Sequence, residues 1–196
     1  LDNLVLKFPE VNVVAISDVL ESSKSLAERY NVPNFYTDYR DLINNPDVEA
    51  VVICSPTDRH AENILAAVTA GKQVFCEKPM DLSLETVQEL EDIIEASGVK
   101  FMLGFNRRFD PNFKKIKSLI DEGKVGETHI VKITSRDPAP PPVSYIKSSG
   151  GMFVDMTIHD FDMARFMAGS EVKQVFAVGK NLVDPEIGKA GDIDTA

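Results

Sequence analysis

Short apolar runs alternate with longer segments of helical character in the first half of the chain. Four runs have the length and composition of buried strands: "VNVVAI" (11–16), "VEAVVICS" (48–55), "KQVFCE" (72–77) and "VKFMLGF" (99–105). Three segments between them have the pattern of helices: 21–30, 57–71 and 83–98. Gly71 and Gly98 mark the ends of the last two. Strands that alternate with helices predict βαβ units, and therefore a doubly wound α/β domain with a parallel sheet.

The pattern changes after Gly104. Amphipathic helices are predicted over 110–126 and 155–169, and strands over "THIVKITSR" (128–136) and "VKQVFAVGK" (172–180). Residues 137–142, "DPAPPP", read as a loop because prolines interrupt regular structure. We therefore expect an α+β domain in the second half.

The distribution of charge supports the same division. Of the 196 residues, 43% are hydrophobic and 27% charged, which is ordinary for a globular protein. Residues 1–104 hold 8 basic and 18 acidic side chains, whereas residues 105–196 hold 13 of each. This shift predicts two domains, 1–104 and 105–196. The net charge of −10 argues against a nucleic-acid partner.

The remaining composition bears on location. No apolar stretch approaches the length of a membrane span, so no membrane association is expected. Cys54 and Cys76 both lie at the ends of apolar runs, as small buried residues do in a reducing compartment. We therefore predict a cytoplasmic protein.

The two ends of the sequence suggest a fragment. A dinucleotide-binding domain begins with a strand and a glycine-rich turn, but the sequence contains no G-x-G-x-x-G. Residues 1–10 resemble the tail of a helix, and "GDIDTA" (191–196) resembles the start of a strand. We expect the phosphate-binding loop and the C-terminal part of the protein to be missing.

Polar and turn-forming residues follow the predicted strands. Asp18 ends the first run, where an acidic side chain accepts hydrogen bonds from ribose hydroxyls and disfavours a 2′-phosphate; a helix N-cap is an equal alternative. "ICSPTDRH" ends the next strand, and its Ser55, Pro56 and Thr57 would let backbone amides approach a ligand. His60 lies one helical turn further on, and by itself indicates only a surface or packed histidine.

"VFCEKPM" (74–80) places a lysine directly after the third apolar run. By itself Lys78 suggests a solvated strand end, and Pro79 a simple strand terminator. If Lys78 is aimed from a tight corner, the Lys78–Pro79 bond is predicted to be cis, a form found in about 5–6% of X–Pro bonds.

Asp155, His159 and Asp162 have the spacing i, i+4, i+7, which predicts one face of a helix. A carboxylate one turn before a histidine can fix its tautomer and stabilise the imidazolium, as a general base requires. The alternatives are a solvated acidic face and a facial triad for a metal. Because no H-x-x-x-H or C-x-x-C accompanies the histidine, we predict no metal.

Four segments together resemble the glucose–fructose oxidoreductase/inositol dehydrogenase family: "CSPTDRH", "VFCEKPM", "LGFNRRFDP" and "GGMFVDMTIHDFDMARF". The resemblance covers essentially the whole chain and is greatest to the inositol 2-dehydrogenases of that family. It implies a second domain dominated by a largely antiparallel sheet, and a catalytic set of Lys78, Asp155 and His159. His159 would remove the hydroxyl proton, Asp155 would orient His159, and Lys78 would hydrogen-bond the hydroxyl.

The resemblance also implies the ligands. NAD would be bound by residues that follow the strands of the first domain: Asp18, Ser55, Pro56, Thr57, His60, Glu77 and Lys78. The substrate would be inositol or a related polyol or sugar, with Arg107 and Asp162 on neighbouring hydroxyls, and the protein would form a homotetramer. The alternatives are an oxidoreductase for a pyranose sugar or sugar acid, and a regulator that binds dinucleotide or sugar without catalysis.

Overall fold

The chain forms two compact units. The computed structural model describes the backbone of residues 1–196 and every side chain except that of Lys147. One unit consists of Leu1–Cys76 and Ser83–Met102, and the other of Glu77–Leu82 and Leu103–Ala196. The short segment that carries Lys78 therefore belongs with the second half of the chain.

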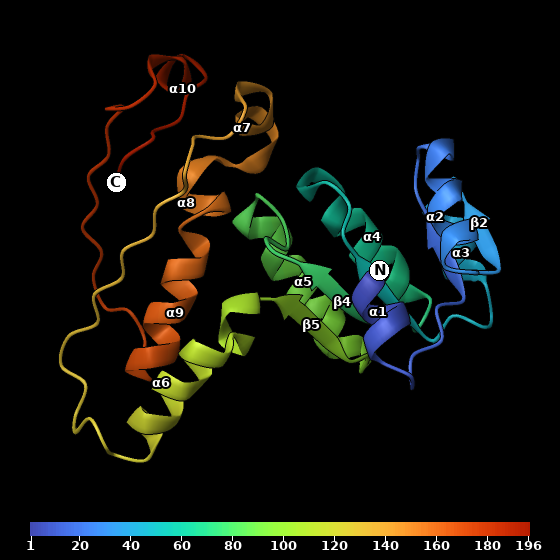
Figure 1. Cartoon of the computed structure of the whole chain (residues 1–196), viewed down its shortest axis with the longest axis horizontal. Helices are drawn as coiled ribbons and strands as arrows, with labels where there is room; N and C mark the ends of the chain where they lie inside the picture. Colours follow the sequence, from blue (N-terminus) through green and yellow to red (C-terminus); the bar gives the residue numbers. More distant parts are fainter. The chain divides into compact units, whose positions relative to one another are not determined.

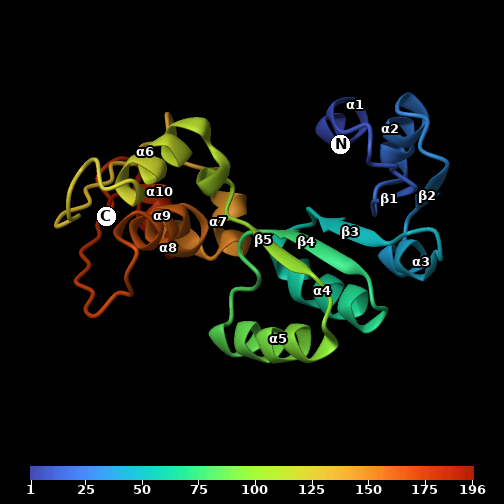
Figure 2. The same cartoon turned by 90° about the horizontal axis from the view of Figure 1, so that it is seen from below.

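The first unit contains the predicted parallel strands. β1 (Ala15–Ser17) pairs in parallel with β2 (Asn34–Tyr36), and β3 (Ala50–Ile53) in parallel with β4 (Gln73–Glu77). β5 (Phe101–Gly104) completes a three-stranded sheet in the order β3-β4-β5 (Figure 2). The prediction of parallel strands is thus confirmed, although β2 was not predicted.

Helices cover the strands of this unit. They are α1 (Asp2–Lys7), the 3₁₀ turn Glu21–Ser23, α2 (Lys24–Arg29), α3 (Tyr39–Asn44), the 3₁₀ turn Thr57–Arg59, α4 (His60–Thr69) and α5 (Leu84–Ser97). α4 packs beside α5 on one face of the three-stranded sheet, and Ile64, Ala67 and Cys76 are fully buried there (Figure 2). The three predicted helices are confirmed, and α3 is an addition.

The second unit is built mainly from helices. They are the 3₁₀ turn Asn106–Phe109, α6 (Pro111–Asp121), α7 (Val143–Ser149), α8 (Gly151–Asp155), α9 (Ile158–Ala168) and α10 (Pro185–Lys189). The sequence determines the start of α6, because the Asp110 carboxylate accepts the amide hydrogens of Asn112 and Phe113 and Pro111 occupies the first turn. α7, α8 and α10 were not predicted.

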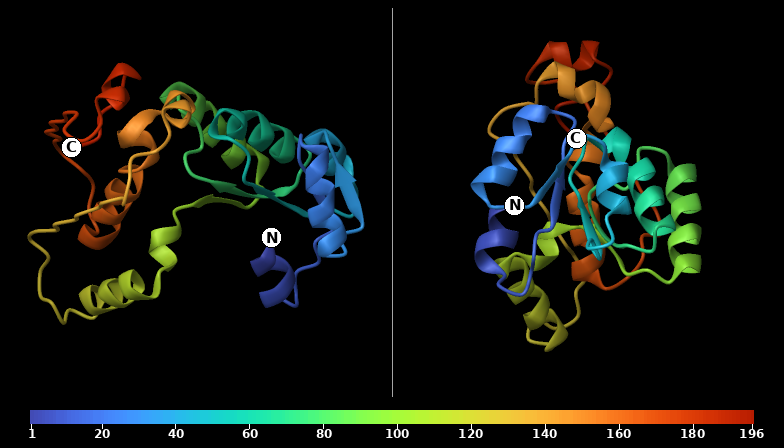
Figure 3. Two further views of the ribbon diagram at one scale, coloured as in Figure 1. Left: turned by 45° about the horizontal axis from the view of Figure 1, so that its top comes forward. Right: turned by 90° about the vertical axis from the view of Figure 1, so that its right-hand side faces the viewer.

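Two predicted strands do not form in this unit. Segments 128–136 and 172–180 run as extended chain (Figure 1), and the described part of the unit holds a single antiparallel bridge, Lys180 to Thr195. A strand needs a hydrogen-bonded neighbour along its length. In the second segment Phe176 is 90% exposed and Val178 is 66% exposed, so the apolar side of its alternating pattern is largely unpacked. The left-hand view of Figure 3 shows the first segment looping from α6 toward α7.

The helix predicted over 155–169 is also divided. The amide of Met156 donates to the carbonyl of Met152, and the amide of Thr157 donates to the same oxygen. That second bond spans five residues instead of four, so α8 ends and α9 starts afresh at Ile158. Asp155 therefore does not lie on one continuous helical face with His159 and Asp162, as their i, i+4, i+7 spacing predicts.

Candidate active site

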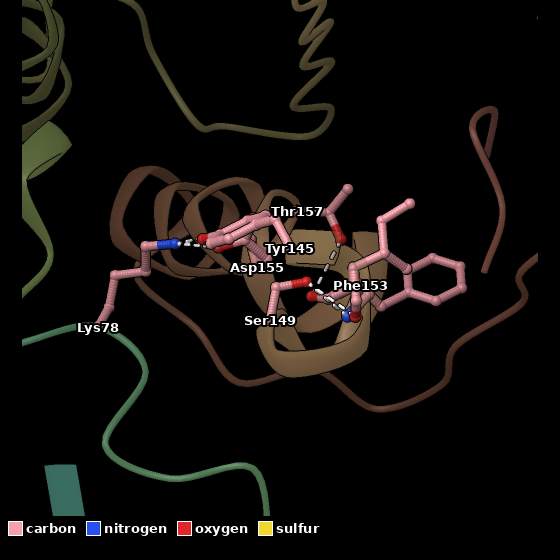
Figure 4. Close-up of polar contacts among 8 residues, drawn as sticks. Lys78, Tyr145, Ser149, Phe153, Asp155 and Thr157 are labelled. Atoms are coloured by element: carbon pink, nitrogen blue, oxygen red, sulfur yellow. Dashed lines mark hydrogen bonds and ion pairs between the residues drawn. The ribbon is translucent and has the colours of Figure 1, made fainter. Parts of the chain in front are cut away.

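Lys78 and Asp155 form the centre of a polar cluster in the second unit. Lys78 follows β4, and its bond to Pro79 is cis, as predicted. Its Nζ donates to the Asp155 backbone oxygen at 2.6 Å and to Oδ1 of the same residue at 2.9 Å (Figure 4). Both side chains are largely shielded from solvent. Two contacts to one residue hold the ammonium more firmly than a surface ion pair would.

The end of α8 explains this arrangement. The last carbonyls of a helix have no donor within the helix and carry partial negative charge. Because α8 ends at Asp155, its terminal carbonyl and its side chain both attract the Lys78 ammonium.

Two glycines and an aspartate hold the other end of α8. Gly150 and Gly151 have φ values of 83° and 79°, which favour glycine. A Cβ on Gly151 would lie 2.7 Å from Oδ1 of Asp192. The Asp192 carboxylate accepts the Met152 amide hydrogen at 3.0–3.1 Å. The "GGM" sequence therefore lets the carboxylate approach the start of the helix that carries Asp155.

Tyr145 is a third member of the cluster. Its hydroxyl donates to Oδ1 of Asp155 at 2.9 Å, so this oxygen accepts from both Tyr145 and Lys78 (Figure 4). Burial raises the pKa of Tyr145, and the hydrogen bond to Asp155 and its negative charge raise it further. Nothing in the sequence motifs indicated Tyr145.

His159 lies in the first turn of α9, where the charges of Lys78 and Asp155 act on its imidazole. Burial lowers the pKa of its imidazole, and the positive charges of Lys78 and Arg107 lower it further, against the opposing charges of Asp160 and Asp155. Its Nδ1 is buried and has no hydrogen-bond partner among the described residues. The imidazole is thus harder to protonate than an ordinary histidine, and its neutral form can accept a proton.

The predicted contact between Asp155 and His159 is absent from the described hydrogen bonds. The break at Met156 and Thr157 takes the carboxylate out of the helix register, and Lys78 and Tyr145 occupy its Oδ1 instead. The expectation that Asp155 orients His159 stays a prediction, while the hydrogen bonds place the Asp155 carboxylate against Lys78. Asp155 orients Lys78.

Arg107 contacts Asp160, a residue that was not predicted. Arg107 Nη1 pairs with Oδ1 of Asp160, and Ser135 Oγ donates to the same oxygen at 2.6 Å. Asp160 follows the histidine of the motif directly, and that adjacency was the only available signal for it.

Asp162 departs from its predicted role. Its side chain is 5% exposed, and Arg108 clamps it with Nε at 2.8 Å from Oδ2 and Nη2 at 2.5 Å from Oδ1. The guanidinium also lies 5.1 Å from the centre of the Phe166 ring. A carboxylate paired in this way helps to pack α9, and its assignment to a substrate hydroxyl stays a prediction.

Asp18 lies directly after β1, as predicted. Its carboxylate accepts the Leu20 amide hydrogen and the Ser23 hydroxyl hydrogen, each at 2.8 Å. These contacts fix the turn that leads into α2. These two contacts fit the alternative interpretation of Asp18 as a local cap. They also leave acceptor positions on the carboxylate for a ligand, since a carboxylate offers about four lone pairs.

The turn after β3 is held by the first turn of α4. His60 is 2% exposed, and its Nε2 lies 2.8 Å from the Ser55 backbone oxygen. Asn63 Nδ2 donates to Ser55 Oγ at 3.0 Å. His60 is therefore a packed histidine that shapes the turn of Ser55, Pro56 and Thr57, and its role as a cofactor contact stays a prediction.

The described residues show neither a metal-binding cluster nor a membrane-spanning helix. They contain no group of three or more His, Cys, Asp and Glu side chains arranged to hold a metal ion. They also contain no helix with the length and apolar character to cross a membrane.

Comparison with known proteins gives the family. Residues 1–105 match the profile described as "Oxidoreductase family, NAD-binding Rossmann fold", and residues 113–196 match the "GFO/IDH/MocA C-terminal domain". The chain belongs to the GFO/IDH/MocA oxidoreductase family. Its first unit is accordingly a Rossmann-like NAD-binding fold with parallel sheets.

Individual relatives are similar along most of this chain. It is 52% identical to the myo-inositol 2-dehydrogenase of Thermotoga maritima over 93% of its own length and 55% of that protein. It is 54% identical to the inositol 2-dehydrogenase of Rhizobium meliloti over 76% of its own length and 45% of that protein.

A solved structure extends the comparison. The scyllo-inositol dehydrogenase of Lactobacillus casei with bound NAD(H) and scyllo-inositol has a TM-score of 0.86 and 35% identity, covering 98% of this chain and 58% of that one. The chain spans about half the length of the curated relatives it matches.

Proposed function

We propose that the full-length protein containing this sequence is an NAD-dependent dehydrogenase that oxidises a secondary hydroxyl of inositol or a related polyol. The observation that supports this proposal most directly is the cluster in the second unit. Asp155 holds the Lys78 ammonium there, and the positive charge of that ammonium lowers the pKa of His159. The names of similar inositol dehydrogenases support the choice of substrate class.

Lys78 has the donors that this chemistry needs. An ammonium carries three N–H donors, and two of them are used on Asp155. The third can donate to the substrate oxygen and stabilise the negative charge that develops on it as the hydroxyl proton leaves. Asp155 keeps the ammonium in place and leaves that donor available.

His159 is the proposed base. Its lowered pKa keeps the imidazole unprotonated at neutral pH, so it can take the hydroxyl proton while the C–H bond of the same carbon breaks. The hydroxyl oxygen becomes a carbonyl oxygen, and the proton remains on the imidazole until solvent removes it. Arg107, held by Asp160, is proposed to bind a neighbouring hydroxyl.

Residues at the carboxyl ends of the parallel strands would hold the cofactor. We propose Asp18 for the adenosine ribose and the turn of Ser55, Pro56 and Thr57 for backbone contacts, with Glu77 and Lys78 after β4. The acceptor positions left on the Asp18 carboxylate fit ribose hydroxyls. When bound, NAD supplies the acceptor for the hydride.

We further propose that the protein is a cytoplasmic homotetramer with domains 1–104 and 105–196. The family resemblance supports the tetramer. The placement of both cysteines at the ends of apolar runs supports a cytoplasmic location, and the change of charge near Gly104 supports the boundary between the two domains. Size-exclusion chromatography with light scattering on the full-length protein tests the assembly.

A substrate panel tests the function. The full-length protein is incubated with NAD or NADP and with myo-inositol, scyllo-inositol, pyranose sugars and sugar acids, and nicotinamide absorbance is followed. Oxidation of an inositol with NAD is expected. Turnover of pyranoses alone would move the assignment to a sugar oxidoreductase, and binding of NAD without turnover of any compound would favour a regulator.

A further inference from the structure

Tyr145 lies at the Lys78–Asp155 pair, and the proposed chemistry leaves it without a role. Its hydroxyl and the Lys78 ammonium both donate to Oδ1 of Asp155, each at 2.9 Å (Figure 4). Tyr145 comes from α7, whereas Asp155 ends α8 and Lys78 follows β4. Three separate segments of the second unit therefore meet at one carboxylate oxygen.

We propose that Tyr145 is a positioning residue of the dehydrogenase reaction, which acts through Asp155 to hold the Lys78 ammonium on the substrate oxygen. This inference rests on the proposed function. It adds a residue that lies outside the set of Lys78, Asp155 and His159 and outside the motifs that contain them.

The hydrogen bond restricts the Asp155 carboxylate. A carboxylate at the end of a short helix can rotate about its side-chain bonds, and each rotation moves the acceptor for Lys78. Two donors from different directions select one orientation, and a charge-assisted hydrogen bond to a carboxylate is stronger than one between neutral groups. Without the tyrosine hydroxyl, Lys78 would retain the backbone contact at 2.6 Å but lose the fixed position of its second acceptor.

The placement of Tyr145 is itself fixed by α7. Ile146 is 5% exposed and Ser149 is 3% exposed, so the helix is anchored by its other face. Ser149 Oγ accepts the Gly151 amide hydrogen at 3.2 Å, which ties the end of α7 to the start of α8. The hydroxyl is thus presented to Asp155 by a rigid ring on an anchored helix.

The direction of the pKa shift fits a donor. Burial and the Asp155 carboxylate raise the pKa of Tyr145, so the hydroxyl stays protonated through neutral pH. A tyrosine that removed protons from the substrate would need a lowered pKa. Tyr145 therefore donates to Asp155 and leaves proton abstraction to His159.

Removing the hydroxyl should leave the fold intact. Tyr145 is 44% exposed, and Phe retains the ring and its contacts. Tyr145→Phe therefore removes one hydrogen bond from the cluster without opening a cavity. Equal unfolding midpoints of variant and unchanged protein by circular dichroism establish this before kinetics are compared.

The kinetic test uses the full-length protein with myo-inositol and NAD. Tyr145→Phe is expected to lower kcat about tenfold with KM within about twofold, because a positioning residue acts on the transition state more than on substrate binding. In an Asp155→Ala background, which removes the acceptor of the Tyr145 hydroxyl, the same change should alter kcat by less than about twofold, because the hydroxyl has lost the group through which it acts. Full additivity of the two substitutions, or a rise in KM alone, would overturn the proposal.

Tyr30 provides a matched control. Its hydroxyl also donates to an aspartate carboxylate, that of Asp2, in the first unit. Tyr30→Phe removes the same kind of bond and should leave kcat and KM unchanged. An equal fall in kcat for both variants would show a general effect of losing a tyrosine–aspartate bond and would contradict the positioning role.

A titration separates this inference from the proposed function. The pKa of Tyr145 is measured by NMR with ¹³C-labelled tyrosine, and Asp155→Asn is expected to lower it, because the carboxylate charge is removed. If the protein oxidises no compound of the panel, the proposed function fails while this result still establishes the pairing. A pKa that is the same in both proteins would overturn the pairing whatever the activity.

Discussion

Lys78 and Asp155 lie 77 positions apart in the sequence, yet the Lys78 ammonium contacts both the carbonyl and the carboxylate of Asp155. The pair unites the turn after β4 with the end of α8. Asp155 thus supports the lysine, in addition to the role toward His159 that the sequence spacing predicts.

Replacing Lys78 tests its part in catalysis. Lys78→Met in the full-length protein should lower kcat by about 10²–10³, the range for loss of one preorganised donor to a developing oxyanion. Initial rates with myo-inositol and NAD measure it. Lys114→Met removes a positive charge from an exposed position on α6 and should leave the rate unchanged. Retention of most of the activity in Lys78→Met would remove the lysine from the mechanism.

The pH dependence should report the lowered pKa of His159. The base must be neutral, so kcat/KM should fall as the pH decreases through a pKa below the ordinary histidine value of 6.5. A pH–rate profile for myo-inositol oxidation measures it. An inflection above 6.5, with proton transfer shown to limit the rate, would contradict the assignment.

Lys78 should contribute to that pKa. Its positive charge lowers the pKa of His159, so Lys78→Met is expected to raise it. NMR titration of the imidazole C–H resonances follows the shift without requiring activity. The exposed His129 serves as an internal control, since its resonances should be unaffected by the substitution. No movement of the His159 pKa would show that the two groups are not coupled.

Asp18 should select the cofactor. Asp18→Ser is expected to raise kcat/KM for NADP relative to NAD by about tenfold or more, because the carboxylate repels a 2′-phosphate. Ser23→Ala is the matched control: it removes the hydroxyl partner of Asp18 but keeps the charge. A natural preference for NADP would contradict this reading of Asp18.

Gly151 should be less replaceable than Gly123. Both have positive φ, but a Cβ at Gly151 would meet the Asp192 carboxylate at 2.7 Å, whereas one at Gly123 would meet nothing within 4 Å. Gly151→Ala should therefore lower the free energy of unfolding by about 1–3 kcal/mol more than Gly123→Ala. Urea unfolding of the full-length variants measures the difference. Equal losses would show that the Asp192 contact is unimportant to stability.

The sequence alone established the first unit well. Periodicity of 2 or of 3.6 residues is a local property, and the strands 50–53, 73–77 and 101–104 with the helices between them follow from it. β2, of three residues, and α3, of six, were not predicted. The residue types at strand ends also indicated Lys78 and its cis proline.

The sequence was less informative about the second unit. Segments 128–136 and 172–180 alternate as strands do, but a strand depends on main-chain partners that lie elsewhere in the fold. The spacing of Asp155 and His159 is that of one helix face. The hydrogen bond from the Thr157 amide to the Met152 carbonyl spans five residues, however, and this breaks the helical register between them.

The tertiary structure decided which polar groups meet. Asp162 and Asp160 are near neighbours in the sequence, yet Arg108 buries the first and Arg107 holds the second. Tyr145 enters the cluster only because α7 packs beside α8. Residue types and local spacing thus determine which chemistry is available. Pairing among charged groups depends instead on packing between distant segments, because each donor binds the acceptor that the fold brings within about 3 Å.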